Sequence, residues 1–258
     1  MIENAYNYHT HTVRCGHATG EDREYVEVAI RGGIKKMGFS DHISLRYPDG
    51  YEAGYRVPTD RAKEYAESVR ALQKEYAGKI EIFLGFETEY YVDQFEKMLA
   101  FSKELGVDYW ILGQHFVGGD RDNVYSGWEG DDENRLAQYA AQVCAAMETG
   151  KFSYVAHPDL LNYTGEKEIY CKHMRKIAEK SKETGIPLEI NFLGIRDNRH
   201  YPNERFWEIA GEVGSPVVFG FDAHDPRSAA DKASLKKANE LIEKYRLNVI
   251  DEPKLLPL

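Results

Sequence analysis

Short apolar runs alternate with amphipathic segments along the whole chain. Runs that we expect to form strands occupy residues 6–8, 36–40, 80–85, 109–113, 154–156, 188–191 and 217–221. Segments with a helical spacing of apolar positions fill the gaps, at 22–31, 59–76, 94–105, 131–149, 166–184, 203–213 and 228–245. Short strands that alternate with helices predict a parallel sheet with helical crossovers.

Side chains that can bind metal ions follow most of the predicted strands. They are His9 and His11, His42, Glu87, His115, His157, Glu189 with Asn191, and Asp222 with His224. In a closed barrel the carboxyl ends of all strands meet in a ring at one face, whereas an open doubly wound sheet would spread these residues along a crevice. We therefore expect a distorted (β/α)7 barrel, similar to a TIM barrel, with its active site at the C-terminal ends of the strands.

Two pairs of candidate ligands share a spacing of two residues. His9 and His11 end the first apolar run, and Asp222 and His224 follow the last. Residues i and i+2 of a strand point to the same face, so each pair can converge on one metal ion. A single zinc ion takes about four ligands, and the chain offers about nine. Two or three divalent ions that share a carboxylate fit better, and an imidazole-rich site suits Zn, Fe or Mn.

Composition narrows the class of protein. The 258 residues contain no Pro/Gly/Ser-rich linker, so we expect one domain over residues 1–258. The formal net charge of −10 argues against a surface that binds nucleic acid or anionic lipid. Three cysteines without a CxxC spacing indicate reduced thiols. Without a signal peptide or a membrane-length apolar stretch, we expect a soluble, cytoplasmic protein, whose oligomeric state stays open.

The ordered motifs resemble those of the polymerase-and-histidinol-phosphatase (PHP) family over nearly the whole chain. They are His9-Thr10-His11, Asp41-His42, Gly85-Phe86-Glu87, Gly113-Gln114-His115, His157-Pro158-Asp159 and Gly220-Phe221-Asp222-Ala223-His224. Two stretches, 14–20 and 188–196, resemble the histidinol-phosphatase branch in particular. Phe221 stands where a small residue is common and Gln114 where Ser is common, but neither departure removes a ligand.

The resemblance implies a trinuclear metal centre. One ion would take His9, His11, Glu87 and Asp222, a second Glu87, His115 and His157, and a third His17, His42 and His224. It also implies that Arg196 binds the substrate phosphate, with Asn191, Arg199 and Arg14 as weaker candidates for substrate contacts. Asp41 adjoins a ligand, and we expect it to support the site from the opposite side of its strand.

The activity that the resemblance implies is metal-dependent hydrolysis of L-histidinol phosphate in histidine biosynthesis. Three divalent ions would bring a charge of about +6, against about −2 from Glu87 and Asp222, which leaves a pocket that suits an anionic phosphate monoester. Histidinol is cationic, so we expect an acidic or aromatic partner for its ammonium and imidazole groups.

Three other functions stay open on the residues alone. A PHP-family phosphoesterase for nucleotides or DNA ends is disfavoured by the net charge. Amidohydrolase-type enzymes also begin with HxH and end with a strand Asp, but often need a Lys at the fourth strand end, where this chain has Gly113-Gln114-His115. A metal-stabilised binding module is disfavoured, because a structural metal site is closed and this ring of ligands is large and open.

Overall fold

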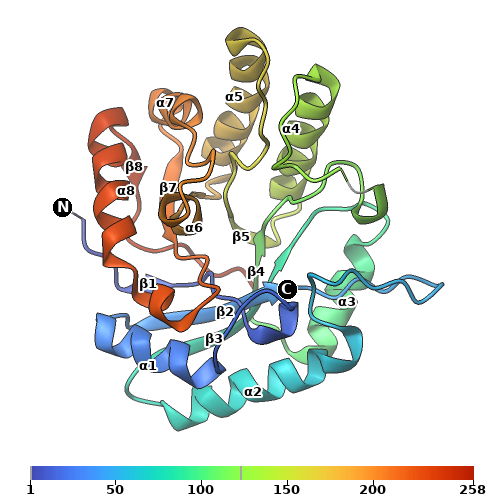
Figure 1. The fold of residues 1–258 in the computed structure, drawn as a ribbon, viewed down its shortest axis with the longest axis vertical. Helices are drawn as coiled ribbons and strands as arrows, with labels where there is room; N and C mark the ends of the chain where they lie inside the picture. Colours follow the sequence, from blue (N-terminus) through green and yellow to red (C-terminus); the bar gives the residue numbers. More distant parts are fainter. Residues whose placement is uncertain (1, 123) are drawn as a thin grey trace.

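The computed structural model describes residues 2–122 and 124–258, and its strands form one parallel sheet in sequence order (Figure 1). The strands are β1 (Tyr6–Asn7), β2 (Lys36–His42), β3 (Glu81–Thr88), β4 (Tyr109–Leu112), β5 (Phe152–Val155), β6 (Leu188–Asn191), β7 (Pro216–Gly220) and β8 (Asn248–Val249). Each strand pairs in parallel with the next. The predicted distorted, TIM-barrel-like α/β fold is confirmed.

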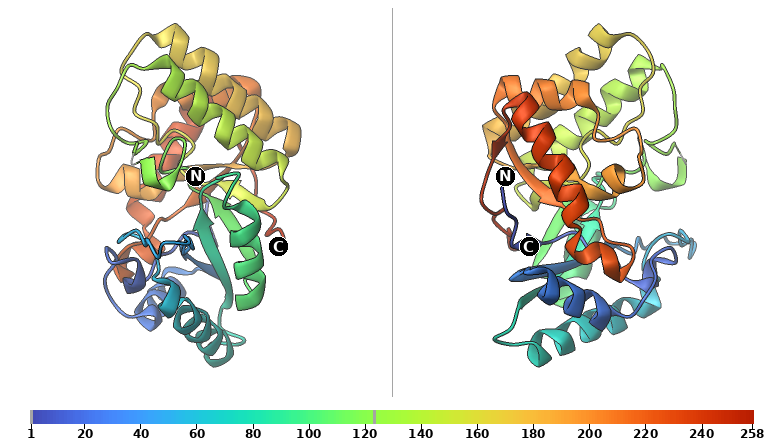
Figure 2. Two further views of the ribbon diagram at one scale, coloured as in Figure 1. Left: turned by 90° about the vertical axis from the view of Figure 1, so that its right-hand side faces the viewer. Right: turned by 60° about the vertical axis from the view of Figure 1, so that its left-hand side comes forward.

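Helices pack outside the strands. They are α1 (Asp22–Gly32), α2 (Ala62–Glu75), α3 (Phe95–Leu105), α4 (Glu133–Glu148), α5 (Lys167–Thr184), α6 (Phe192–Arg196), α7 (Glu204–Val213) and α8 (Lys232–Tyr245). In Figure 1, α1 and α2 lie below the strands, α4, α5 and α7 lie above them, and α8 runs along the left edge toward α1 (Figures 1 and 2). Within the described ranges, no helix has the length and apolar character needed to span a membrane.

Local signals in the sequence explain where these helices begin and end. Glu21 and Glu24 form a capping box at the start of α1, and Gly33 ends that helix in the left-handed conformation with φ 92°. Between these ends, α1 buries Tyr25, Val26 and Ala29 against the sheet. The helix is therefore held by one apolar face and by satisfied backbone groups at both ends.

A backbone contact closes the barrel on the side of the metal-ligand motifs. Thr10 and Ala223 form a parallel bridge beyond the ends of β1 and β7. The amide of His11 donates to the carbonyl of Ala223 at 2.9 Å, and the amide of Ala223 donates to the carbonyl of His9 at 3.1 Å. The first and last ligand motifs of the sequence are thereby joined side by side.

The structure differs from the prediction in several short elements, among them the 3-10 helices Val13–Cys15 and Asp120–Asp122, which were not predicted, and Thr59–Arg61, which precedes α2. Strand β8 and the five-residue helix α6 were absent from the prediction. The segment 228–245, predicted as one helix, consists of a 3-10 helix (Pro226–Ala230) followed by α8. Asp231 separates them because its backbone is extended and its side chain caps α8 by accepting from the amide of Ser234.

Aromatic side chains fill the end of the barrel opposite the ligand motifs. The cluster consists of Tyr6, Tyr8, Tyr109, Ile111, Tyr154, Ala156 and Val218. Ile250 and Leu255 from the C-terminal segment pack against it. Glu252 fixes that segment by accepting from the Tyr8 hydroxyl and from the ammonium group of Lys36, at 2.8 Å. The C-terminal residues therefore cover this end of the barrel.

Candidate metal centre

Glu87 lies at the centre of the gathered histidines. It sits near the end of β3 and is 1% exposed. Its Oε1 atom lies 2.9 Å from Nε2 of His157 and 3.5 Å from Nε2 of His115. Gly113, directly after the neighbouring strand β4, makes this position possible, because a Cβ atom there would lie 1.9 Å from Oε1.

The second oxygen of Glu87 faces a different group of imidazoles. Its Oε2 atom lies 3.2 Å from Nδ1 of His42, 3.4 Å from Nε2 of His11 and 3.5 Å from Nε2 of His9. One carboxylate thus presents its two oxygens to two sets of nitrogen donors. This arrangement is the one that a carboxylate bridging two metal ions requires.

Asp222 brings the last motif of the sequence to the same place. Its Oδ1 atom lies 3.3 Å from Nε2 of His11, 3.5 Å from Nε2 of His9 and 3.2 Å from Nδ1 of His224. Asp222 and His157 both have positive φ, 46° and 31°, which is costly for residues other than glycine. The backbone is therefore turned at these two positions, where it aims side chains into the site.

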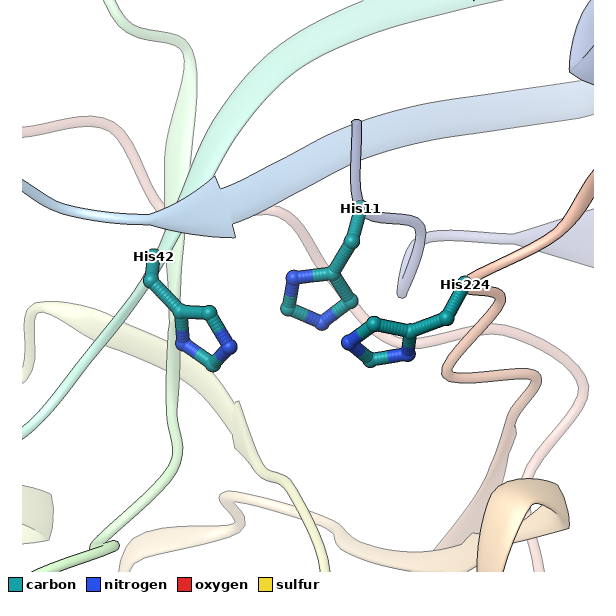
Figure 3. A group of neighbouring side chains, drawn as sticks. All are labelled: His11, His42 and His224. Atoms are coloured by element: carbon teal, nitrogen blue, oxygen red, sulfur yellow. The ribbon is translucent and has the colours of Figure 1, made fainter. Parts of the chain in front are cut away.

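A third group contains only imidazoles. His11 lies between His42 and His224, with ring centroids 4.4 Å and 4.1 Å away, and Figure 3 shows the three rings pointing into one space. His17 is exposed, with its ring 4.8 Å from that of His224 and 5.3 Å from that of His42. The structure thus brings together all three histidines that the resemblance implied for one ion, and it adds His11 to them.

The polar atoms of the site fit bound metal ions. Among the candidate ligands, five buried side-chain atoms have no hydrogen-bond partner within the described residues: Nε2 of His9, Nε2 of His11, Nδ1 of His42, Nδ1 of His157 and Oδ1 of Asp222. Buried polar atoms without partners are rare, and those aimed at a common point indicate a ligand. Imidazole nitrogens with carboxylate oxygens form a donor set that divalent transition metals accept.

Ionisation of His42 and Glu87 favours metal binding. At His9 and His11, burial lowers the pKa, but the surrounding carboxylates outweigh it and raise the pKa above the ordinary value, so a metal ion would displace a proton from each of these rings. Burial lowers the pKa of His42 well below its ordinary value, and the neighbouring His11 lowers it further, so the ring is neutral and keeps a free lone pair. Burial raises the pKa of Glu87, but the surrounding imidazoles outweigh it and hold the pKa well below the ordinary range. Neutral imidazoles and an ionised carboxylate are the forms that bind metals.

Carboxylates behind the imidazoles orient three of the rings. Each carboxylate accepts a hydrogen bond from Nδ1 of its ring, which leaves Nε2 of that ring free to face the centre. The pairs are His9 with Glu189 at 2.8 Å, His11 with Asp41 at 3.4 Å, and His115 with Glu89 at 3.0 Å. Asp41 thus lies behind the candidate ligand His11. Sequence reasoning left Glu89 out, although it stands two residues after Glu87 and therefore on the same face of the strand.

A cavity of about 530 Å³ opens onto the centre, and seven of its lining residues are candidate ligands. Tyr55, Phe116 and Tyr125 add an aromatic wall to it, in which the rings of Tyr55 and Phe116 stack at 5.3 Å. Tyr55 and Tyr125 were absent from the predicted site, because they stand in loops whose sequence carries no periodic pattern.

The predicted substrate contacts are placed very differently from one another. Arg199 lines the cavity, where its guanidinium donates to the Tyr201 hydroxyl at 3.0 Å and to Asp197 at 3.1 Å. Arg196 lies outside the cavity lining; it pairs with Asp231 at 3.1 Å and donates to the carbonyl of Asp222 at 3.2 Å.

The other two candidates for substrate contacts are occupied within the protein. Arg14 is 8% exposed and is held by Asp22 at 2.8 Å. Asn191 is 1% exposed and caps α6 by accepting from the amide of Gly194. Its amide nitrogen donates to Asp222 at 3.0 Å, so Asn191 orients a candidate ligand from behind.

A parallel barrel with imidazoles and carboxylates gathered at the carboxyl ends of its strands defines the class of barrel proteins with a metal-binding site at that face. The PHP domain matches residues 7–192. The chain is also 32% identical over 230 residues to a probable histidinol-phosphatase of Deinococcus radiodurans, which covers 84% of this chain and 85% of that protein. The chain belongs to the PHP family.

More distant proteins are also similar to this chain, in sequence or in fold. The histidinol-phosphatase of Bacillus subtilis is 24% identical, over 84% of this chain and 92% of its own length. The histidinol phosphate phosphatase of Lactococcus lactis, whose crystal structure is a complex with zinc, L-histidinol and phosphate, superposes with a TM-score of 0.71 at 19% identity, over 98% of this chain and 97% of that one. A putative histidinol phosphatase from Listeria monocytogenes has a TM-score of 0.73 at 21% identity, over 89% of this chain and 99% of that one.

Proposed function

We propose that this protein is a metal-dependent phosphoric monoester hydrolase that converts L-histidinol phosphate to L-histidinol and phosphate in histidine biosynthesis. The observation that carries the proposal is the position of Glu87, whose two oxygens face separate groups of imidazoles at the end of a cavity that also holds an arginine. The relatives named as histidinol-phosphatases share most of their length with this chain and support the same substrate.

The metal centre that we propose holds two to three divalent ions, Zn, Fe or Mn. The residues that would hold them are His9, His11, His17, His42, Glu87, His115, His157, Asp222 and His224. Such ions supply an activated water molecule and positive charge to a phosphate ester. The chain's own part is to fix the ligands: Glu189, Asp41 and Glu89 each keep a proton on Nδ1 of one imidazole.

Arg199 is the phosphate-binding arginine that we propose. It lines the cavity, and its pKa is raised because Tyr201, Asp222 and Asp197 outweigh the lowering effect of burial, so it stays charged. A guanidinium binds two phosphate oxygens at once. Arg196 takes a supporting role instead, because it donates to the backbone of the segment that carries Asp222.

The cationic part of histidinol has partners on the cavity wall. Asp197 lines the cavity and offers a carboxylate to the ammonium group, and the stacked rings of Tyr55 and Phe116 offer a flat surface to the imidazole. Both partners belong to loops rather than to strands. We propose that they distinguish this substrate from smaller phosphate esters.

The organisation that we propose is one domain over residues 1–258. Its support is that the bridge between Thr10 and Ala223 joins the segment after β1 to the segment after β7, together with the motifs that they carry. The cytoplasmic location stays a prediction.

A phosphate-release assay on metal-loaded protein tests the function. Histidinol phosphate should exceed p-nitrophenyl phosphate and nucleoside monophosphates in kcat/KM by at least about tenfold, which corresponds to roughly 1.4 kcal/mol of recognition of the leaving group. Equal rates across the panel would indicate a general phosphatase. Faster release from 5′-phosphorylated DNA would favour a nucleic-acid substrate and overturn the proposal.

A further inference from the structure

We propose that Arg56 is a positioning residue that couples the candidate ligand His115 to the aromatic wall of the cavity. This inference rests on the proposed function for its substrate. Arg56 lies in the loop between β2 and α2, and its side chain is 2% exposed. A fully buried guanidinium is costly unless every charge near it is matched, so its partners are informative.

Three separate segments meet at the guanidinium. Nη1 lies 2.8 Å from Glu89 Oε2, directly after β3, and Nη2 lies 2.7 Å from Asp120 Oδ1, in the loop after β4. Nη1 also donates to the carbonyl of Ile43, directly after β2, at 3.3 Å. The planar guanidinium can make these contacts together, whereas a lysine ammonium on a flexible stem cannot hold both carboxylates in the same geometry.

One arm of this cluster leads to the metal centre. Glu89 is fully buried and divides its two oxygens: Oε2 faces Arg56, and Oε1 accepts from Nδ1 of His115 at 3.0 Å. Nε2 of the same ring lies 3.5 Å from Glu87. Arg56 therefore holds the carboxylate that holds the ring, and it compensates a negative charge that would otherwise be unmatched in the interior.

The other arm leads to the substrate cavity. Asp120 is 1% exposed and accepts from the Tyr55 hydroxyl as well as from Arg56. The guanidinium carbon of Arg56 also lies 4.9 Å from the centre of the Tyr55 ring. Tyr55 in turn stacks on Phe116, and both rings line the cavity. The same guanidinium therefore fixes the wall that would contact the leaving group.

Arg56 contacts the metal centre through Glu89 and the cavity wall through Asp120, so a substitution can remove either connection separately. Glu89→Gln removes the charge on the ligand arm, and Asp120→Asn removes the charge on the cavity arm. Arg56→Lys weakens both. Arg23→Lys is the matched control, because Arg23 donates to Glu75 at 2.7 Å on the surface and does not line the cavity.

The experiment measures metal content together with kinetics for histidinol phosphate and for glycerol phosphate, whose leaving group has no ring. Glu89→Gln should lower metal affinity by about 10–100-fold, the effect typical of the hydrogen-bond partner of a ligand, and should leave the ratio of the two KM values unchanged. Asp120→Asn should keep the metal and raise KM for histidinol phosphate by about fivefold or more, with less than about twofold for glycerol phosphate. Arg56→Lys should combine both effects, and Arg23→Lys should show neither.

A purely structural role for Arg56 predicts another result. The three variants would then melt at lower temperature, and kcat/KM would fall equally for both substrates with full metal content, which would overturn the proposal. If Arg56→Lys fails to fold, the two carboxylate variants still decide the question. If wild-type protein releases no phosphate from histidinol phosphate, the proposed function fails, whereas the effect of Glu89→Gln on metal affinity still tests the ligand arm.

Discussion

At the scale of single residues, Glu87 combines roles that no other side chain in the site shares. It is buried, its low pKa keeps it charged, and its two oxygens face different imidazoles. Glutamine has the same shape, but it exchanges one oxygen for an amide nitrogen that cannot bind a metal ion. The exchange therefore isolates the ability of this residue to bridge.

Glu87→Gln should release at least one metal ion per chain and lower kcat by more than about a hundredfold, beyond the 10–100-fold typical of a residue behind a ligand. Metal analysis of protein purified without chelator, together with the phosphate-release assay, measures both effects. Asp41→Asn is the comparison, because Asp41 lies behind His11 and does not face the centre. Full metal content and near wild-type activity in Glu87→Gln would exclude a bridging role.

Two nearby arginines are expected to respond differently to removal. Arg199→Ala should lower kcat/KM by a factor that corresponds to a loss of about 1.5–3 kcal/mol of transition-state stabilisation, the scale of a charge-assisted hydrogen bond. The metal content should stay unchanged. Arg196→Ala removes the donor to the Asp222 carbonyl and the partner of Asp231, so it should lower metal retention and the melting temperature instead. The reverse pattern, with a silent Arg199→Ala, would return the phosphate to Arg196.

The arginines also mark a limit of prediction from sequence. The candidate ligands could be placed because strand direction and register decide where a strand end lies. Arg196 stands on a short helix, and its partner Asp231 caps another helix later in the chain. A long flexible side chain chooses between such a partner and the cavity only once the tertiary structure exists, and no local pattern records that choice.

At the scale of elements, glycines at the end of one strand or directly after it make room for carboxylates on the neighbouring strand. A Cβ atom at Gly113 would lie 1.9 Å from Oε1 of Glu87, and one at Gly220 would lie 1.8 Å from Oε2 of Glu189. Both glycines stand where neighbouring parallel strands approach the site. Each carboxylate therefore turns toward the imidazoles across a stretch of backbone that carries no side chain there.

Gly113→Ala should accordingly push the Glu87 carboxylate out of place and reduce metal content and activity together. Gly54→Ala is the control, because a Cβ atom at Gly54 meets nothing within 4 Å. Circular dichroism separates this effect from unfolding, since a misplaced carboxylate leaves the helix signal intact. If Gly113→Ala binds its full complement of metal, the close approach has no consequence for the site.

The elements themselves could be predicted where burial is periodic. Strand β6 has the predicted bounds, and β3 continues three residues beyond its predicted end because Glu87 and its neighbours are buried too. Strand β8 has two residues, one exposed and one partly buried, so it leaves no apolar run to detect. Helix α6 has five residues and depends on its cap by Asn191, a residue that was interpreted as a substrate contact.

At the scale of the whole molecule, the C-terminal segment covers the end of the barrel opposite the metal centre. Leu255 packs on the cluster around Tyr6, Tyr8 and Tyr109 described above, and the amide of Leu256 donates to Ser153 at 3.0 Å. A chain that stops after Val249 would expose this cluster to water while keeping every candidate ligand. Its melting temperature should fall by about 5 °C or more, with metal content unchanged at low temperature.

Thermal unfolding of the shortened and full chains under the same metal concentration measures this effect. The single exchange Glu252→Gln, which weakens the contact with Lys36, should produce a smaller decrease in the same direction. An unchanged melting temperature in the shortened chain would mean that the segment contributes no stability.

The bridge between Thr10 and Ala223 has a consequence for how the protein is made. His9 and His11 leave the ribosome long before Asp222 and His224, which stand much later in the sequence. Until Asp222 has been synthesised, the early imidazoles therefore lack the carboxylate beside them. Closing so long a loop carries an entropic cost, which a bound metal ion would help to offset. The contact that closes the barrel and the candidate metal site are completed in the same event, so a product that ends before Asp222 would have neither.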